Sequence, residues 1–422
     1  MRVLVLTDGF PPDIVGGLEI SAHQICHGLA RSGHQLHVLA REGEAFAEDD
    51  QPNIRVERIW KQRYRREEFH RFPAKLHGWL EVNARYRNAS WNVPLLRKHL
   101  ASHSYDLCFC FGIEKAGIAL ATEAARHGLP VLWSAGDYFL FEHQNSQNDS
   151  ALARLNMATV SRKWIQMALN HPFEFVAYNS ENTLRHFAKA GYVADYNWVV
   201  HRSCAIPEQI QPYDHSRELT FVIASQIERH KGVHIAIQAA SELVQRVPSD
   251  WKLQIIGSGN EAYLNELRSM VPTLGLTGRI EFKGKLPHKE ATRAMQSCRA
   301  VIHPAIWDEP FGRISIEAMA NGAPLIASES GAIREIAGDD GALIYPKEDV
   351  SALARHMEAV LSDTSLGERL VHTGREIVRA RFTPEFELSR YLDILRAIEA
   401  KEPLSTTPPP WTRASALEFG QE

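Results

Sequence analysis

Short apolar runs alternate with longer amphipathic segments along most of the chain. The longer segments place apolar residues at helical spacing, as in the fragment 18–34, which Gly33 is expected to end. This alternation is typical of parallel sheets flanked by helices. The strands predicted in the first half of the chain are 3–6, 36–40, 54–59, 106–111, 130–135 and 173–178.

A second series of the same alternation follows in the second half of the chain. Its predicted strands are 220–225, 252–257, 280–284, 300–304, 324–328 and 342–346, with helices between them such as 233–246 and 350–361. Two consecutive series predict an α/β protein with two doubly wound, Rossmann-like domains facing a central cleft, and a cleft of this kind is the expected ligand site.

The domain boundaries are predicted from local composition. An N-terminal Rossmann-like domain (1–205) precedes a polar, proline-bearing linker (206–218) and a C-terminal Rossmann-like domain (219–384). A terminal amphipathic helix (385–400) is expected to cross back to the N-terminal domain. The remaining segment, 401–422, has three consecutive prolines and few apolar residues, so it is predicted to be a disordered tail.

Composition narrows the class of protein further. The chain has 422 residues, enough for two cores, and its formal net charge of -4 does not indicate a nucleic-acid partner. The five cysteines lack metal-ligand spacing, which favours a reduced compartment and no structural zinc. The sequence contains neither an apolar run of membrane-spanning length nor a recognisable signal peptide, so we expect a cytoplasmic location.

The segment "DEPFGRISIEAMANG", residues 308–322, places two glutamates around a predicted helix start. Pro310 suits the entry to a helix, and the Asn-Gly pair at 321–322 suits its end, so the helix is expected from about Gly312 to Ala320. It follows a predicted strand, so its first turn should lie at the carboxyl edge of the sheet. Backbone N–H groups there favour phosphate or an electron-rich sugar oxygen.

Glu309 precedes those donors and Glu317 follows them inside the helix. Ionised carboxylates only accept hydrogen bonds, so this pair suits a ligand with both phosphate and vicinal hydroxyls, such as a nucleotide sugar. The alternative is that Glu309 only complements the helix dipole and Glu317 is a solvated helix residue.

A basic cluster follows the first strand of the second series. In "ASQIERHKG", Ser225 and Gln226 end the strand, and Arg229, His230 and Lys231 precede a helix. Cations at a helix start oppose its dipole unless an anion lies between them, so phosphate binding is favoured. Solvated loop charges are the alternative for each residue taken singly.

Two further loops offer glycine at a strand-to-helix junction. Gly16 and Gly17 directly precede the first predicted helix, where glycine allows backbone N–H groups to approach a ligand. The spacing is not that of a dinucleotide-binding G-x-G-x-x-G loop, and a loop without a ligand is the alternative. Gly257 belongs to a second, weaker loop of this kind.

Four motifs occur in the order "FPPDIVGGLE", "HKG", "EPFGRISIEAMANGAPLIAS" and "SGAIRE". Together they closely resemble family 4 of the glycosyltransferases, retaining enzymes with the two-domain GT-B fold, over most of residues 1–395. The E-x7-E element with its Phe-Gly pair is the most specific part. The resemblance implies a nucleotide-sugar donor on the C-terminal domain and an acceptor on the N-terminal domain.

The resemblance also implies roles for single residues. Glu317 would hold the ribose hydroxyls, Glu309 and the backbone at Phe311 and Gly312 would hold the transferred sugar, and Lys231 would neutralise the diphosphate. The predicted catalytic residues are Glu309, Lys231 and Asp137. The predicted donor-binding residues are Gly16, Gly17, Ser225, Gln226, Arg229, Lys231, Gly257, Glu309, Pro310, Phe311, Gly312, Arg313 and Glu317. No metal and no further cofactor are expected, because cationic side chains and helix starts can stabilise the leaving group.

Two positions depart from the pattern of the family. Ser225 and Gln226 stand where Gly-Arg is common before the lysine, so Arg229 is the candidate replacement cation. Gly136 and Asp137 stand where many members have His-Asp. The identity of the donor therefore stays open between UDP- and GDP-hexose.

The segment 60–79 mixes six Lys or Arg with five large aromatic residues. It suits an anionic membrane surface or a lipid-linked acceptor, with a solvated amphipathic segment as the alternative. We therefore expect a glycosyltransferase that acts on a glycan, glycolipid or small-molecule hydroxyl, at the inner face of a membrane if this segment contacts lipid. The rival hypotheses are a catalytically silent GT-B partner protein and a nucleotide-sugar epimerase or phosphorylase on the same fold.

Overall fold

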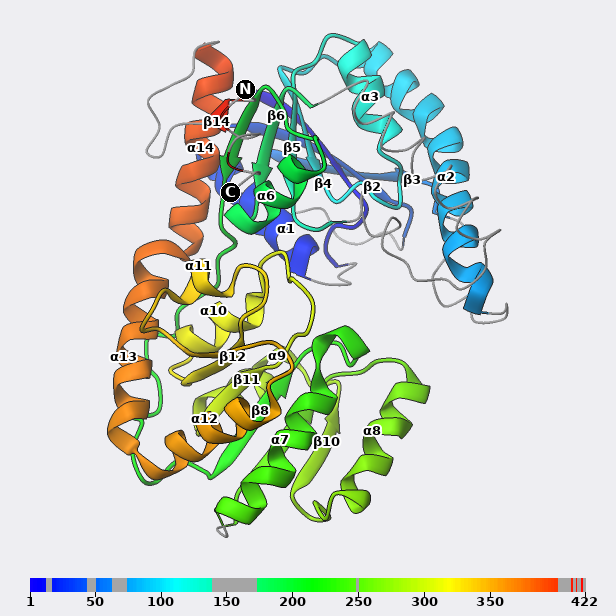
Figure 1. Ribbon diagram of the computed structural model, residues 1–422. Coiled ribbons are helices and arrows are strands. Elements are labelled where there is room, and N and C mark those ends of the chain that lie inside the picture. Colours follow the sequence, from blue (N-terminus) through cyan, green and yellow to red (C-terminus); the bar gives the residue numbers. More distant parts are fainter. Residues whose placement is uncertain are drawn as a thin grey trace. The chain divides into compact units, whose positions relative to one another are not determined.

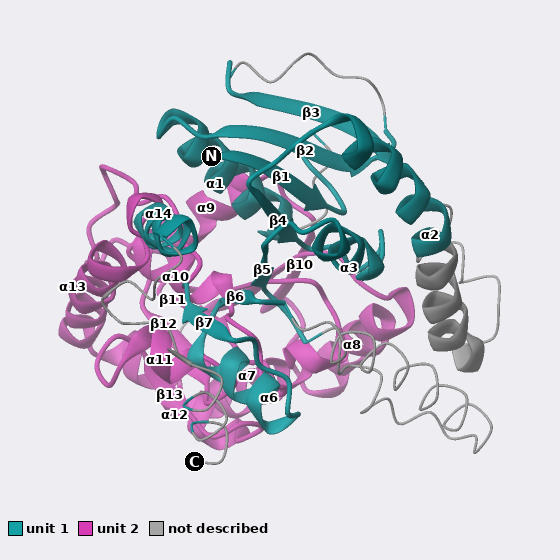
Figure 2. Ribbon diagram, turned by 90° about the horizontal axis from the view of Figure 1, so that it is seen from above, with its two compact units in different colours: residues 1–200, 387–422 teal, residues 201–386 magenta. Residues whose placement is uncertain are grey.

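The computed structural model describes residues 1–12, 17–43, 51–62, 74–138, 173–247, 250–400, 411–412, 415 and 419, without the side chains of 74–87 and 411–412. Contacts divide the chain into two compact units. Unit 1 comprises Met1–Val200 with Glu387–Glu422, and unit 2 comprises His201–Phe386 (Figure 2). Each unit is a sheet flanked by helices (Figure 1).

The sheet of unit 1 has the order β14-β7-β6-β5-β4-β1-β2-β3 among its described strands. All neighbouring pairs are parallel except β14 with β7. The bounds are β1 Arg2–Thr7, β2 Gln35–Arg41, β3 Ile54–Trp60, β4 Leu107–Phe111, β5 Val131–Ala135, β6 Phe175–Tyr178, β7 Tyr196–Val199 and β14 Trp411–Thr412.

Helices connect and cover these strands. They are α1 Gly17–Arg31, α2 Ala74–Ser102, α3 Ala119–Arg126, α6 Glu181–Lys189 and α14 Pro384–Ala400. Apolar residues of α1 and α14 pack in one cluster with alternate residues of the central strands, such as Val3 and Val5. The hydroxyl groups of Tyr391 on α14 and Ser134 on β5 lie 2.9 Å apart within this unit.

The sheet of unit 2 has the order β10-β9-β8-β11-β12-β13 and is parallel throughout its described pairs. The strands are β8 Thr220–Ala224, β9 Lys252–Ile256, β10 Ile280–Gly284, β11 Ala300–His303, β12 Leu325–Ser328 and β13 Leu343–Tyr345. The helices are η2 Arg229–Lys231, α7 Val233–Arg246, α8 Glu261–Thr273, α9 His288–Ser297, α10 Arg313–Ala320, α11 Ile333–Ala337, α12 Val350–Ser362 and α13 Thr364–Arg381.

Burial alternates along the strands of this second sheet. Phe221 and Ile223 of β8 join the core under α7, α8 and α12, whereas Val222 joins a second core with α10 and α11. Because a strand points successive side chains to opposite faces, both faces of the sheet are covered. The two units are therefore α/β units of the doubly wound kind that the sequence predicts.

The division between the units falls earlier than the expected linker. Residues 206–218 are part of unit 2, because the buried Arg217 anchors them. Its guanidinium donates hydrogen bonds to the carbonyl oxygens of Pro212, Cys298 and Gly322, at 2.9, 3.3 and 2.8 Å. The polar composition of 206–218 suggested a linker, but the segment is held in unit 2 by the buried guanidinium of Arg217.

Two short strands were not predicted from the sequence. Tyr196–Val199 forms β7, and Trp411–Thr412 of the expected disordered tail forms β14, which pairs antiparallel with β7. The pairing joins residues far apart in the sequence, so a local pattern holds no signal for it. The tail was expected to be disordered, and in this respect the expectation was incomplete.

We predict that Arg217→Met lowers the free energy of unfolding by about 3 kcal/mol or more, because it leaves several buried carbonyl groups without their donor. Urea denaturation of the full chain measures the effect. Arg268→Met, which changes a half-exposed arginine on α8, is the matched control and should change stability little. Equal stabilities for the two variants would contradict the anchoring role of Arg217.

Candidate nucleotide-sugar site

The candidate site lies at the carboxyl edge of the sheet in unit 2, where the strand order changes direction. From β8 the next strands run outward to β10, and from β11 they run the other way to β13. Doubly wound folds bind ligands at this switch point. The loops after β8 and β11 bring Lys231 and Glu309 there.

The backbone packs these two loops directly against each other. The N–H of Ile306 donates to the carbonyl of His230 at 2.9 Å. Gly232 has φ +69°, and a Cβ at this position would lie 1.8 Å from the carbonyl oxygen of Pro304. Only glycine fits this close approach, so the glycine of the "HKG" motif sets the spacing between the two loops.

Glu309 is the centre of a network of charged and polar side chains. One carboxylate oxygen accepts a hydrogen bond from Lys231 Nζ, and the other lies 2.6 Å from His303 Nε2. The other ring nitrogen of His303, Nδ1, lies 3.0 Å from Ser315 Oγ. The network therefore joins the end of β11, the loop after β8 and the first turn of α10.

The electrostatic environment keeps Glu309 ionised. Burial raises the pKa of this carboxyl, but the neighbouring His303 and Lys231 lower it by more, so the net pKa lies well below its ordinary value. An ionised carboxylate only accepts, so His303 Nε2 carries the hydrogen in this contact. The Nδ1 of the same ring faces the Ser315 hydroxyl from the first turn of α10.

A neighbouring loop fixes the backbone of Glu309. The N–H of Ala332 donates to the Glu309 carbonyl at 3.3 Å. Asp308 Oδ1 accepts from the Gly331 N–H at 3.2 Å and from Lys347 Nζ at 2.7 Å. The predicted "SGAIRE" loop thus holds residues 308 and 309 through hydrogen bonds.

The start of α10 has the expected form. The helix spans Arg313–Ala320 and begins after Gly312, which has a left-handed conformation and offers no side chain to cap it. Helix starts of this kind bind anions through their first backbone N–H groups. The Phe311 side chain is buried in the core, so it is the backbone at this position that is suited to a ligand.

Glu317 has a different environment from Glu309. Its carboxylate lies 3.4 Å from Arg313 Nε, and its side chain is 24% exposed, against 14% for Glu309. Glu317 is paired within one helix, whereas Glu309 is held by residues from two other elements. The two glutamates of the E-x7-E element are therefore not equivalent.

The two predicted cations have separate partners. Lys231 contacts Glu309 and lies 5.5 Å from the ring centroid of Trp307. Arg229 is bonded to Glu266 and lies over the ring of Tyr263, both on α8. The structure thus places Lys231 in the Glu309 network and directs the Arg229 side chain to α8.

The predicted residues at the ends of β8 and β9 are neighbours. The Ser225 N–H donates to the Ile256 carbonyl at 3.1 Å, and the Ser225 hydroxyl donates to the Gln226 carbonyl at 3.0 Å. A Cβ at Gly257 would lie 1.8 Å from the Ser225 carbonyl oxygen. The structure brings these three predicted residues to the same edge of the sheet.

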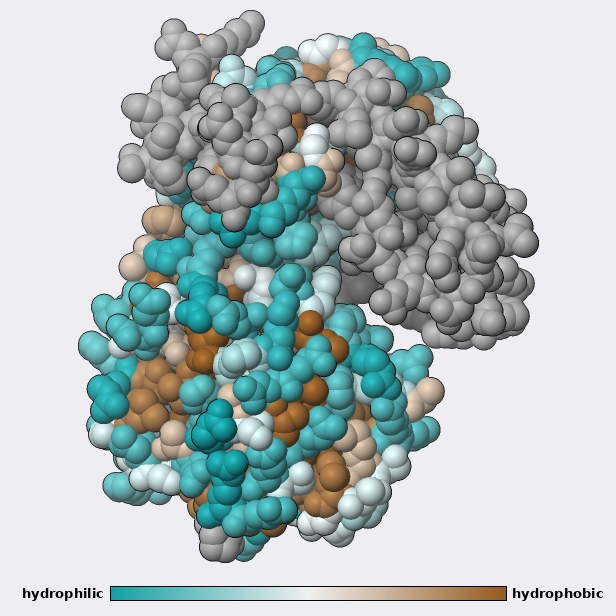
Figure 3. All heavy atoms as spheres, in the orientation of Figure 1, coloured by the Kyte–Doolittle hydropathy of each residue, from teal (hydrophilic) through white to brown (hydrophobic). Residues whose placement is uncertain are grey.

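In unit 1, Gly17 is the first residue of α1 and Asp137 follows β5. Gly16 lies outside the described residues. Most of the predicted surface segment 60–79 also lies outside them, but the backbone of 74–79 is described and forms the first turns of α2. Among the described helices, none combines the length and apolarity of a membrane span. The visible face of unit 2 intersperses apolar groups among hydrophilic residues (Figure 3).

Sequence reasoning missed three polar residues. His303 and Ser315 belong to the Glu309 network, and His303 could have been suspected because it ends a strand directly before the Glu309 loop. The third, Asp8, follows β1 and accepts from the N–H groups of Lys115 and Ala116 at 2.7 and 2.6 Å. Burial raises the pKa of Asp8 to about 7 despite these two donors.

Comparisons with known proteins agree across both units. Residues 206–377 match the model described as glycosyl transferases group 1, and residues 16–201 match the glycosyl transferase 4-like domain. The chain is 24% identical over 408 residues to an uncharacterized glycosyltransferase of Methanocaldococcus jannaschii, covering 91% of this chain and 95% of that protein. It is 25% identical over 412 residues to a glycogen synthase of Mycobacterium tuberculosis, covering 92% and 91%.

The fold has solved counterparts as well. The structure of HepE from Anabaena in complex with UDP and glucose superposes with a TM-score of 0.70 at 21% identity, covering 94% of this chain and 100% of that one. At this level of identity the likeness concerns the fold, and together with the two parallel-sheet units it identifies the fold as GT-B.

We predict that Glu309→Gln lowers the free energy of unfolding by roughly 2 kcal/mol at pH 7, because it removes the charge that pairs with Lys231 and His303. The folded-state pKa of Glu309 is lowered, so its contribution is present above the unfolded value of about 4.3 and is lost as the pH falls below it. Urea denaturation at a series of pH values measures the difference between wild type and variant.

The difference between wild type and Glu309→Gln should therefore shrink on acidification. Glu261→Gln, at an exposed glutamate on α8, should leave stability within about 0.5 kcal/mol at every pH. A wild-type advantage that does not depend on pH would refute the ionised network.

Proposed function

Because the chain belongs to the GT4-type glycosyltransferases, we propose that it transfers a hexose from UDP- or GDP-hexose, with retention of anomeric configuration, to a hydroxyl of a glycan, glycolipid or small molecule. The observation that supports this most is the ionised Glu309, held between Lys231 and His303 at the switch point of the sheet. A site of this kind offers acceptors for sugar hydroxyls beside donors for phosphate.

In this proposal Lys231 and the start of α10 stabilise the departing diphosphate. Negative charge develops on the leaving phosphate during transfer, and a positioned cation and backbone N–H groups lower the energy of that charge. Lys231 already faces the site through its contact with Glu309. The chemistry proposed here needs no metal ion, since these groups supply the positive charge.

Glu309 positions the transferred sugar. Its carboxylate accepts hydrogen bonds from sugar hydroxyls, while His303 and the backbone contact with Ala332 keep it from rotating away. Transfer requires the reacting atoms to be held at short range, so a fixed carboxylate lowers the barrier by orientation. Glu309 is an acceptor of hydrogen bonds here and does not exchange a proton.

Glu317 holds the ribose of the nucleotide. Its carboxylate is more exposed than that of Glu309 and lies about one turn beyond the start of α10, which suits the two hydroxyls of a ribose. Before the nucleotide binds, Arg313 is its ion-pair partner. The resemblance to family 4 implies that Asp137 is catalytic. In a product assay, Asp137→Asn should then lower the rate of transfer.

We predict that at least one UDP- or GDP-hexose stabilises the protein against heat. A ligand at 100 times its Kd adds about 2.7 kcal/mol to the free energy of unfolding, which a thermal-shift panel detects. A radiolabelled product assay with glycan and lipid acceptors follows for the donors that bind. If no nucleotide sugar shifts the midpoint at millimolar concentration, the donor site is wrong; binding without turnover would favour a catalytically silent partner protein.

A second prediction separates the two glutamates. Glu317→Gln should weaken nucleotide binding about tenfold, the effect of losing a charged hydrogen bond. Glu309→Gln should chiefly lower kcat, by about 100-fold, because it acts on the transferred sugar. Glu358→Gln on α12 is the control. Steady-state kinetics and calorimetry measure these effects. Equal, small effects at 309 and 317 would mean that neither carboxylate contacts the donor.

A further inference from the structure

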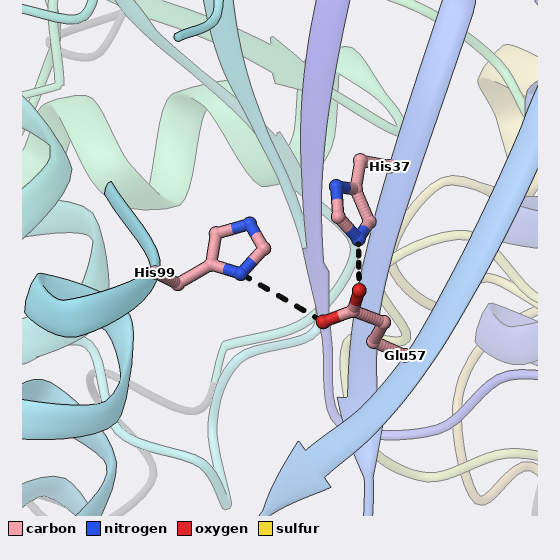
Figure 4. Close-up of side chains that lie close together, drawn as sticks. All are labelled: His37, Glu57 and His99. Atoms are coloured by element: carbon pink, nitrogen blue, oxygen red, sulfur yellow. Dashed lines mark ion pairs between the residues drawn. The ribbon is translucent and has the colours of Figure 1, made fainter. Parts of the chain in front are cut away.

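Three potential metal ligands meet in unit 1, from segments far apart in the sequence. His37 comes from β2, Glu57 from the adjacent β3 and His99 from the last turn of α2 (Figure 4). Each offers one nitrogen or oxygen, and these atoms all lie within 4.8 Å of one another. His37 Nε2 is 3.1 Å and His99 Nδ1 is 3.8 Å from the Glu57 carboxylate. None of the three belongs to the proposed transfer site.

The two histidines of the cluster are buried, and Glu57 is partly exposed. His37 is 7% and His99 is 8% exposed. His37 Nε2 faces the carboxylate at 3.1 Å, yet it forms no hydrogen bond of acceptable geometry. A buried ring nitrogen in this situation costs stability unless another group satisfies it. A bound cation would do so.

Tyr105 orients both imidazole rings from the opposite side. Its hydroxyl lies 2.6 Å from His37 Nδ1 and 2.6 Å from His99 Nε2. With a metal ion bound, the Tyr105 oxygen would accept from one N–H group of each ring. The remaining nitrogens, His37 Nε2 and His99 Nδ1, would then direct their lone pairs to the ion beside Glu57. Metal-binding histidines commonly have their second nitrogen bonded in this manner.

Arg55 is the present counter-ion of the carboxylate. Its Nη2 lies 2.5 Å from Glu57 Oε1, but its side chain is 66% exposed and can turn outward. A cation bound at the cluster would replace this contact without moving the sheet.

We propose that His37, Glu57 and His99 bind one divalent cation of the zinc class, with Tyr105 as the residue that positions both histidines. Two imidazoles and a carboxylate, at bonds of about 2.0–2.2 Å, match the ligands that zinc prefers. Ligand atoms around a tetrahedral ion lie about 3.3 Å apart, so small side-chain rotations suffice. The ion would join β2, β3 and α2, and its role would be structural rather than catalytic.

The test uses the full chain, stripped with a chelator and titrated with Zn²⁺, with crystals soaked in Zn²⁺ for anomalous diffraction at the zinc edge. We expect one tightly bound equivalent, a midpoint of thermal unfolding raised by several degrees, and an anomalous peak between the three side chains. Absence of a peak there in soaked wild-type crystals overturns the proposal, whatever the behaviour of the variants.

Variants separate this site from other histidines of the chain. His99→Gln and Glu57→Gln should weaken Zn²⁺ binding by at least about tenfold, and Tyr105→Phe by about 10- to 100-fold, the range found for residues that orient ligands. His127→Gln is the matched control, since His127 and Glu123 form a pair at 3.7 Å with no third potential metal ligand among the described residues. Unchanged affinity in His99→Gln and Glu57→Gln would also overturn the proposal.

Discussion

The contact between Glu309, Lys231 and His303 is the interaction on which the proposed site depends. A buried carboxylate is unfavourable unless it is paired and hydrogen-bonded, and here a cation and an imidazole from different elements provide both. The same two contacts also fix the orientation of the Glu309 carboxylate. Lys231 is held beside Glu309, so a cation suited to phosphate and a carboxylate suited to sugar hydroxyls lie next to each other.

The parallel sheet makes this contact available. Its strands end at one edge, and the reversal of strand order at β8 and β11 places their loops side by side. Glycine at 232 lets the two backbones touch, and the loop around Gly331 supports Glu309 from behind. The GT-B architecture and the chemistry of the site are thus linked through backbone packing, which explains why glycine occupies positions 232 and 331.

Much of the fold and the centre of the site could be predicted because their signals are local. Apolar runs indicated the central strands, and the Pro-Phe-Gly turn indicated the start of α10 almost to the residue. His303 was missed since a single histidine at the end of a strand is usually a core residue. The β14 pairing, the anchoring of 206–218 by Arg217 and the His37, Glu57 and His99 cluster all join distant segments, so no spacing along the chain reveals them.

The central claim is that the Glu309 network is the place where the sugar and diphosphate of the donor meet. The most direct measurement is a crystal structure of the chain with UDP-glucose or GDP-mannose. We predict diphosphate oxygens within hydrogen-bond distance of Lys231 Nζ and the first N–H groups of α10, sugar hydroxyls on Glu309, and ribose hydroxyls on Glu317. A nucleotide sugar bound elsewhere, with the contact between Lys231 and Glu309 unchanged and no sugar at the carboxylate, would contradict the account.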